Sequence, residues 1–222
     1  MKTFSPEQVI FEDNHLIAIN KLAGQLIQGD KTGDACLADE IKGYLKIKYN
    51  KPGNVFCGVI HRLDRPTSGV VVFAKTSKAL ERMNAQFREK QTDKSYLALV
   101  HGKLSHGDTL INDLKKNEVK NKSFVVDSGK GKQAVLHFKP IKVFDSYTLI
   151  DVHLETGRHH QIRCQMAHFG HPLKGDLKYG AKRSNEDGSI CLHSAKLVFS
   201  HPISQELITL EAELPCTPSW IR

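Results

Sequence analysis

Short runs of strand-forming residues recur along this chain and constrain its fold more than any other feature of the sequence. Val70–Ala74 is apolar and mostly β-branched, which is typical of a buried strand. Residues 206–214 alternate between apolar and polar side chains, which is typical of a half-buried strand in an antiparallel sheet. Further strands are predicted over residues 15–20, 96–100, 134–139 and 147–154.

Helical patterns are fewer and lie at irregular intervals between the strands. The predicted helices run from a cap at Asp34 to about Tyr49, from Ser77 to Lys90, and from Arg158 to Gly170. The predicted fold class is therefore α+β, with a central mixed, mainly antiparallel β-sheet flanked by helices and loops. No internal repeat or long flexible linker interrupts the chain, so a single domain over residues 1–222 is expected.

Basic residues exceed acidic ones, with 32 Lys and Arg against 24 Asp and Glu and a net charge of +8. This excess favours an acidic partner such as nucleic acid, with a basic surface that has no partner as the alternative. No run of 18 apolar residues and no signal-peptide pattern occurs, so no membrane partner is expected. Five scattered cysteines without a Cys-x-x-Cys pair favour a reducing cytoplasm and free, mostly buried thiols.

Residues 113–133 carry six lysines and two glycines and are expected to form a loop or a hairpin. Two interpretations of this charge are open. The lysines either line a solvated edge, as charge runs usually do, or form an arm that contacts phosphates.

Asp64 stands in a polar, turn-forming segment just before the strand predicted at 70–74. The neighbouring His61, Arg62 and Arg65 are basic, and cations favour the ionised form of a carboxyl group. An ionised, oriented carboxylate can act as a nucleophile or as an electrostatic stabiliser. The alternative is an aspartate that only holds a turn, which for an isolated aspartate is the more common case.

Other reaction classes lack their signatures in this sequence. A carboxylate-based glycosidase needs a second carboxylate, and the sequence does not place Asp151 or Glu155 beside Asp64. No G-x-S-x-G, phosphate-binding loop or G-x-G-x-x-G motif occurs, which disfavours serine hydrolases, phosphoryl transfer and hydride transfer.

The histidine-rich stretch 153–171 raises the question of a metal site. His160, Cys164 and His168 fall at i, i+4 and i+8 on one predicted helix, a spacing that can ligate zinc. Arg158 and Arg163 lie in the same stretch, and their charges repel a cation. The segment therefore suits an anion or a nucleotide better, and no metal is predicted.

Several segments resemble motifs of the RluA-type pseudouridine synthases, in the order and at the spacing of that family. They are His61-Arg62-Leu63-Asp64 with Thr67-Ser68-Gly69, Lys94–Gly102, Thr156–Arg163, Gly170–Asp176, Leu192–Ser194 and His201-Pro202. The resemblance extends from about Val9 to Pro215. It departs at Lys21-Leu22-Ala23-Gly24, where the family usually has Lys-Pro-x-Gly, and we expect this to relax a turn without affecting chemistry.

The resemblance implies a role for each motif residue. Asp64 is the expected nucleophile, and Tyr96 is expected to stack on the uracil. Arg163 is expected to pair with Asp64, and Arg158 is the second choice for that pairing, with a phosphate contact as its alternative role. Arg62 resembles the residue that occupies the space left by the displaced base, and His61 is expected either to support this rearrangement or to make a structural hydrogen bond. The other expected contacts to RNA are Arg65, Thr67, Arg158, His160 and Gln161.

The implied activity is the isomerisation of uridine to pseudouridine in ribosomal or transfer RNA, without a cofactor. The resemblance is to the short form of the family, which lacks an N-terminal S4-type RNA-binding module, and a monomer is expected. A non-catalytic RNA-binding protein on the same scaffold is the competing hypothesis. The combination of Asp64, Tyr96 and Arg163 disfavours it, because RNA binding alone needs no nucleophile.

Overall fold

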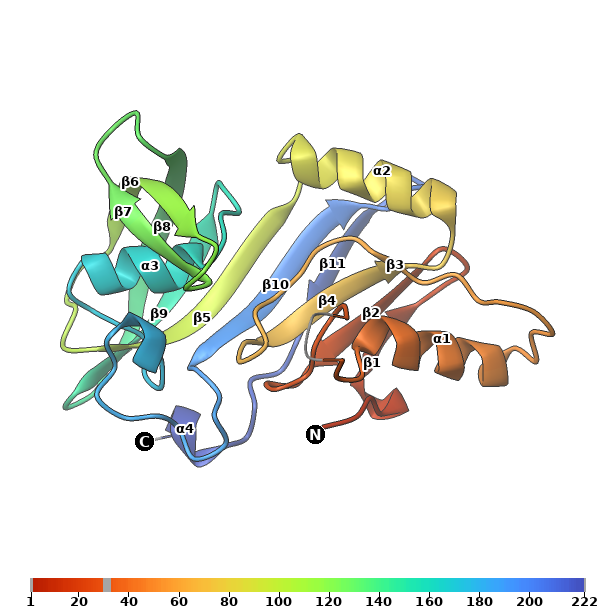
Figure 1. The fold of residues 1–222 in the computed structure, drawn as a ribbon, viewed down its shortest axis with the longest axis horizontal. Coiled ribbons are helices and arrows are strands. Elements are labelled where there is room, and N and C mark those ends of the chain that lie inside the picture. Colours follow the sequence, from red (N-terminus) through yellow and green to blue (C-terminus); the bar gives the residue numbers. More distant parts are fainter. Residues whose placement is uncertain (1, 30–32, 222) are drawn as a thin grey trace. The chain divides into compact units, whose positions relative to one another are not determined.

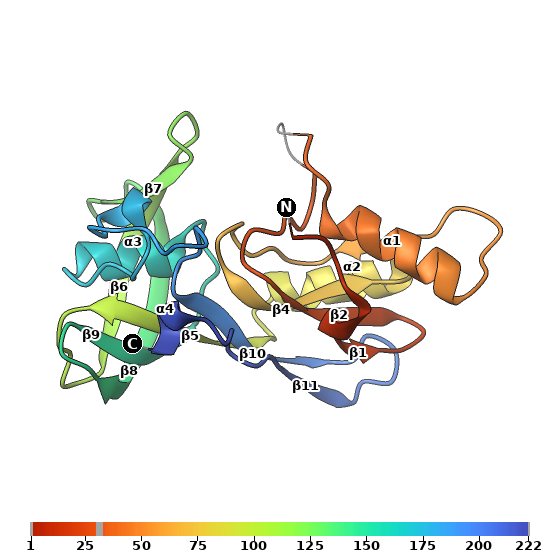
Figure 2. The same ribbon diagram turned by 90° about the horizontal axis from the view of Figure 1, so that it is seen from below.

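The computed structural model describes residues 2–29 and 33–221, which form two compact units. The first contains the chain up to Asp93 and Ser194–Pro215, and the second contains Lys94–His193 and the residues from Cys216 onward. Strands predominate over helices in both (Figures 1 and 2), which confirms the α+β class. The single domain expected over residues 1–222 stays a prediction.

The sheet of the first unit has the strand order β1-β2-β4-β10, with β3 paired to β4 and β11 paired to β10. Its elements are η1 (Pro6–Gln8), β1 (Val9–Glu12), β2 (Leu16–Lys21), α1 (Leu37–Lys48), β3 (Gly58–Val59), β4 (Ser68–Ala74), α2 (Ser77–Arg88), β10 (Leu192–Ser200) and β11 (Leu207–Glu211). Strand β4 is antiparallel to β2, with Gly69 opposite Lys21.

Helices α1 and α2 cover opposite faces of this sheet. Side chains alternate along a strand, so Val72 of β4 packs with Met83 of α2, whereas Val71 packs with Ile41 of α1. Every residue of β4 is consequently buried. This doubly covered strand gives rigid support to the loop that precedes it, residues 60–67.

The second unit is built on an antiparallel sheet with the order β5-β9-β8-β6-β7. Its elements are β5 (Asp93–His101), β6 (Asp108–Asn117), β7 (Lys122–Val126), β8 (Lys132–Val143), β9 (Tyr147–Leu154), α3 (Gln161–His168), η2 (Leu177–Tyr179) and α4 (Pro218–Ile221). Helix α3 packs on one face of this sheet, where Cys164 contacts Leu114 of β6 and Ala134 of β8.

The strands predicted from sequence are confirmed. Residues 15–20, 70–74, 96–100, 134–139, 147–154 and 206–214 correspond to β2, β4, β5, β8, β9 and β11. Residues 113–133 contain the β6–β7 hairpin and the turn into β8, as expected for a loop or hairpin. The sequence did not predict β1, β3 or β10.

The helix boundaries differ from prediction in two places. Helix α1 begins at Leu37 with Cys36 as its N-cap, so the prediction that Asp34 caps it is wrong. Asp34 instead forms an ion pair with Arg65, with 2.9 Å between Oδ2 and Nη1. Helix α3 begins at Gln161 rather than at Arg158, because the residues before it form a loop.

The cysteines match the expectation of free and mostly buried thiols. All five are free, and only Cys216 is exposed. Burial raises the pKa of Cys57 to about 12 and that of Cys164 and Cys191 to about 11, so these thiols stay protonated and inert. Among the described helices, none is long and apolar enough to cross a membrane.

Candidate active site

Asp64 lies half-buried in the loop that enters β4. A turn closes directly after it, because the Thr67 N–H donates to the Asp64 carbonyl oxygen over 3.0 Å. The next carbonyl, that of Arg65, accepts the Gly24 N–H over 2.8 Å. The main chain around Asp64 is therefore fixed by hydrogen bonds both within the loop and to the segment that follows β2.

Lys21, the last residue of β2, holds this loop through hydrogen bonds from its side chain to main-chain carbonyls. Its side chain is fully buried. Nζ lies 2.6 Å from the Thr67 carbonyl oxygen, 3.1 Å from that of Arg65 and 3.4 Å from that of Asp64. The Leu22 carbonyl also accepts from it, over 3.1 Å. One buried amine thus donates to carbonyls of the loop and of the segment after β2; the carbonyls of Leu22, Asp64 and Arg65 also accept main-chain N–H groups.

Burial lowers the pKa of Lys21 to about 7, although the nearby Asp64 carboxylate opposes this shift. Stability should therefore depend on pH. Between about pH 7 and the ordinary lysine value of 10.5, the unfolded chain binds a proton that the folded protein does not. The free energy of unfolding should consequently rise with pH across this range.

Urea denaturation between about pH 7 and pH 9 measures this slope, in a window chosen below the titration of tyrosines. The Lys21→Met variant should show a flatter dependence than wild type. Lys46→Met, which removes an exposed lysine from α1, serves as the matched control and should keep the wild-type slope. Equal slopes for Lys21→Met and wild type would contradict the assignment.

His61 takes a structural position in the same loop. Its Nε2 accepts the Val72 N–H over 3.1 Å, so this nitrogen carries no proton while the bond persists. The ring also stacks on Phe87 of α2, with 4.9 Å between centroids and 18° between planes. The structural hydrogen bond that was one of the two expectations for His61 is therefore present. The other expectation, that His61 supports displacement of the base, stays a prediction.

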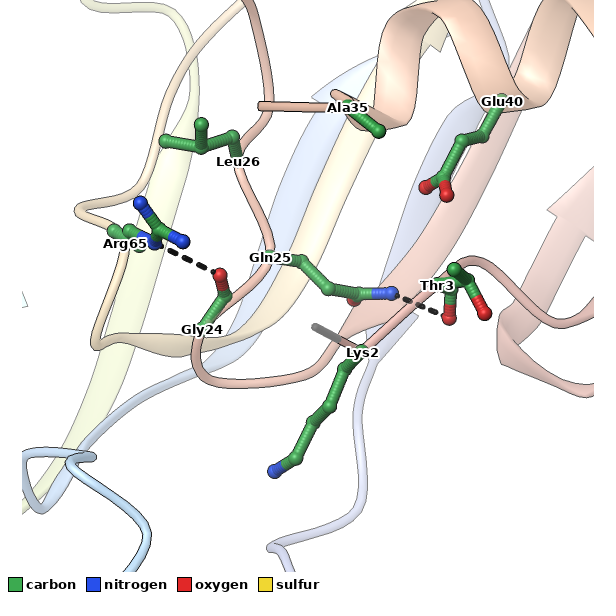
Figure 3. Close-up of a pocket in the computed structure, with 8 residues that line it drawn as sticks. All are labelled: Lys2, Thr3, Gly24, Gln25, Leu26, Ala35, Glu40 and Arg65. Carbon is green, nitrogen blue, oxygen red and sulfur yellow. Dashed lines mark hydrogen bonds between the residues drawn. The ribbon is translucent and has the colours of Figure 1, made fainter. Parts of the chain in front are cut away.

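The two arginines of the segment differ in their surroundings. Arg62 is exposed and, within residues 2–29 and 33–221, takes part in no hydrogen bond or ion pair. Arg65 is tethered by its ion pair with Asp34 and by a 3.1 Å hydrogen bond from Nε to the Gly24 carbonyl. Figure 3 shows its guanidinium directed at that carbonyl, beside a small pocket also lined by Gln25.

Thr67 and Gly69 hold the junction between the loop and β4. Thr67 is 2% exposed, which places its side chain in the interior rather than on a surface open to RNA. Gly69 has φ +115°, and a Cβ there would lie 2.2 Å from the Ser194 carbonyl oxygen of β10. Only glycine fits this close approach, which gives the Thr-Ser-Gly part of the motif a backbone reason.

In the second unit, Tyr96 and Arg163 are both buried. Tyr96 lies on β5 opposite Val152 of β9. Arg163 lies on α3, and Asp176 holds its guanidinium in a bidentate ion pair, with Nε–Oδ2 2.7 Å and Nη2–Oδ1 2.9 Å. The guanidinium carbon also lies 5.1 Å from the centre of the Tyr179 ring. These contacts fix the direction of the guanidinium plane.

His160 directly precedes α3 in the left-handed conformation, with φ 52°. Such backbone is uncommon for residues other than glycine and often marks functional sites. Its Nδ1 lies 3.0 Å from the Tyr179 hydroxyl, and the ring stacks on His159 with 3.8 Å between centroids. Burial, then the charge of Arg163, lowers the pKa of His160 to about 2, so the ring is neutral.

Gln161 and Arg158 shape the same loop. Gln161 is buried, and its side-chain oxygen accepts from the Thr156 hydroxyl and from the Arg158 N–H. Arg158 is exposed, and its Nε donates to the Gln133 carbonyl over 2.9 Å.

The Cys164 thiol donates to the Ser123 carbonyl, and no cluster of metal ligands occurs among the described residues.

The structure thus places the expected site residues in two groups. His61, Arg62, Arg65 and Thr67 lie with Asp64 in the first unit, whereas Tyr96, Arg158, His160, Gln161 and Arg163 lie in the second. The proposed pairing of Asp64 with Arg163 and the stacking role of Tyr96 stay predictions.

The family model for RNA pseudouridylate synthase matches residues 15–168, which include Asp64, Tyr96 and Arg163. The chain belongs to this family. Among similar proteins are "Ribosomal large subunit pseudouridine synthase D" of Zymomonas mobilis, 34% identical over 95% of this chain and 70% of its own, and "Ribosomal large subunit pseudouridine synthase C" of Buchnera aphidicola, 36% identical over 93% and 67%. The expected RluA-type membership and the enzyme class, an RNA pseudouridine synthase, are confirmed.

Solved structures agree with this fold. The structure titled "Human RNA Pseudouridylate Synthase Domain Containing 4" superposes with a TM-score of 0.78 at 21% identity, over 95% of this chain and 89% of that one. "Human RNA Pseudouridylate Synthase Domain Containing 1" gives a TM-score of 0.74 at 23% identity, over 99% and 89%.

Sequence reasoning missed two residues that support the site. It assigned no role to Lys21, although a lysine that ends an apolar strand was a possible signal. Asp176 stands in one of the family motifs, but the sequence did not predict its contact with Arg163, 13 positions earlier. Nothing in the local pattern indicated that contact.

Proposed function

We propose that this pseudouridine synthase isomerises specific uridines in structured RNA with Asp64 as its nucleophile. The observation that carries the proposal is the loop of Asp64, held through its main chain by the buried Lys21 and supported by a strand covered on both faces. A nucleophile needs such fixed placement, because misplacement by about 1 Å can cost 100-fold in rate.

The reaction requires one glycosidic bond to be exchanged for another. Asp64 attacks either C1′ of the ribose or C6 of the uracil. The N1–C1′ bond breaks, the base rotates, and a C5–C1′ bond forms. The bond between Asp64 and C1′ or C6 then breaks and returns its electron pair to the carboxylate, while the C5 proton is lost and N1 gains one. Tyr96 stacks on the uracil and assists removal of the C5 proton, and Arg163 orients the Asp64 carboxylate. No cofactor or metal takes part.

A uridine inside a stacked helix must first leave the stack. Flipping a base costs a few kcal/mol, and less for a base in a loop. Phosphate contacts and stacking on Tyr96, which contributes about 1–3 kcal/mol, offset this cost. Arg62, exposed and without a partner among the described residues, is suited to occupy the vacated space.

Ribosomal RNA is the favoured substrate, because the Zymomonas and Buchnera relatives carry the name of the ribosomal large subunit. Transfer RNA is the alternative. We further propose that the enzyme acts as a monomer in the cytoplasm, a setting that suits its free thiols.

The test uses RNA labelled with tritium at C5 of uracil, prepared separately as ribosomal and as transfer RNA. Wild-type protein should release tritium from one of the two. Pseudouridines in cellular RNA are then mapped chemically with and without the gene. The map made without the gene should lack individual pseudouridines that the other map contains, and these positions identify the target uridines. Failure to release tritium from either RNA, with an intact map in the absence of the gene, would refute the proposal.

A further inference from the structure

The second unit contains a cavity of about 590 Å³ that has no assigned role. It lies over the end of the β6–β7 hairpin, beside the turn into β8 and the loop that precedes α3. Its lining residues come from three segments, 114–123, 129–132 and 157–159. The size is within the range of about 300–1,000 Å³ that is usual for binding sites.

Positive charge dominates this cavity. Lys115, Lys116, Lys130, Lys132 and Arg158 line it, and Glu118 is the single carboxylate among its lining residues. Glu118 pairs with Lys116, and Lys130 pairs with Asp127, but these carboxylates are 78% and 80% exposed. Exposed ion pairs contribute only about 0–1 kcal/mol, so an anionic ligand can replace them readily.

The strand register directs two of these lysines to the same face. Lys132 of β8 lies opposite Leu114 of β6, and Lys116 lies two residues beyond Leu114. Leu114 points toward α3 and packs on Cys164. Side chains at paired and alternate positions share a face, so Lys116 and Lys132 also project from the α3 side. Within the described residues, Lys132 forms no ion pair.

Three glycines border the cavity, and the packing of the hairpin requires one of them, Gly131. Gly129, Gly131 and Gly157 line it without side chains. A Cβ at Gly131 would lie 2.8 Å from Val126 Cγ2 and 2.9 Å from the Leu114 carbonyl oxygen, so no larger residue fits there.

The wall formed by His159 is held in place by the hairpin. The Ser123 hydroxyl donates to the His159 carbonyl over 2.7 Å, and it lies 2.8 Å from Nδ1 of the same residue. This contact joins the lysine-bearing hairpin to the loop that leads into the motif residues of α3.

We propose that this cavity binds phosphodiester groups of the RNA substrate and positions the strand that carries the target uridine. The proposal rests on the proposed function, of which it names a second contact surface. Phosphate contacts position a nucleic acid without reading its sequence. Loss of the lysines should therefore weaken binding to RNA in general and leave the chemical step unchanged.

The experiment compares a Lys116→Gln/Lys132→Gln variant with a Lys139→Gln/Lys142→Gln control. The control changes the net charge equally and alters exposed lysines of β8 that do not line the cavity. Binding of a fluorescein-labelled RNA stem–loop with a uridine-rich loop is measured across KCl concentrations. The slope of log K against log [KCl] should fall by about 1.4–1.8 in the cavity variant, at about 0.7–0.9 per lost phosphate contact.

Two further measurements sharpen the test. Lys116→Arg/Lys132→Arg, which keeps the charge, should keep the wild-type slope and so exclude misfolding as the cause. Tritium release from cellular RNA should show a raised KM and an unchanged kcat in the cavity variant. Uridine 5′-monophosphate serves as a small phosphate competitor and should displace the stem–loop weakly.

A cavity variant that binds RNA with the slope and Kd of the control would overturn the proposal. So would weaker binding of uridine monophosphate with RNA binding intact, because the cavity would then be a nucleotide site. If wild-type protein forms no pseudouridine, the proposed function is refuted. If the salt dependence of RNA binding still differs as expected between the wild type and the cavity variant, the proposal of an RNA-binding cavity is retained.

Discussion

Replacing Asp64 with Asn should reduce pseudouridine formation by at least about a thousandfold, equivalent to ~4 kcal/mol of transition-state stabilisation. Asparagine keeps the size of the side chain but cannot form the covalent intermediate. RNA binding should persist, because the change removes a negative charge from a surface that receives a polyanion. Tritium release and stem–loop binding, measured on the same preparation, separate the two effects.

The matched control is Asp39→Asn, which alters an exposed carboxylate on α1 in the same unit. It should retain wild-type activity. A second readout connects Asp64 to its anchor, since its carboxylate opposes the lowering of the Lys21 pKa. Asp64→Asn should therefore lower the Lys21 pKa further and extend the pH-dependent rise in stability to lower pH. Near wild-type turnover by Asp64→Asn would rule out its role as nucleophile.

The strands and the fold class could be predicted because they depend on local patterns. A run such as Val70–Ala74 is apolar and β-branched over consecutive positions, and burial on both faces leaves no other arrangement that suits it. Strand β10 was missed because Leu192–Ser200 mixes histidine, serine and lysine with apolar residues. Its buried polar residues are accommodated by tertiary contacts that the sequence does not display.

The predicted helix cap failed for a related reason. Asp34 has the chemistry of an N-cap, but the helix begins three residues later, and the ion pair with Arg65 engages its carboxylate. A local preference of about 1 kcal/mol is easily outweighed by where the chain must pass. The same ion pair holds Arg65, the residue next to the candidate nucleophile. The contact that the predicted cap overlooked therefore belongs to the surroundings of the candidate site.

The candidate site divides into residues that a motif can name and residues that only packing reveals. Asp64, Tyr96 and Arg163 stand at motif positions, so the amino-acid sequence alone is enough to name them. Lys21 and Asp176 act on them through buried contacts across 43 and 13 residues of sequence. Both are buried charged residues, which are retained in an interior only when they are paired or hydrogen-bonded.

Removing Asp176 should be the most damaging single change to stability in the second unit. Asp176 is 1% exposed and Arg163 is 5% exposed. Asp176→Ala leaves a buried guanidinium without the carboxylate that binds two of its nitrogens, a loss that typically costs about 3–5 kcal/mol. Native proteins have only about 5–15 kcal/mol of stability, so the variant should unfold at a much lower urea concentration.

A double variant distinguishes the structural role of this pair from its role in catalysis. Arg163→Met/Asp176→Leu replaces both charges with apolar groups, and such exchanges are often neutral in stability. It should recover part of the stability that Asp176→Ala loses. It should not recover tritium release, because Arg163 is the proposed partner of the Asp64 carboxylate. A stable double variant with wild-type kcat would show that the buried pair supports only the fold, and Arg158 would then be the cation to test.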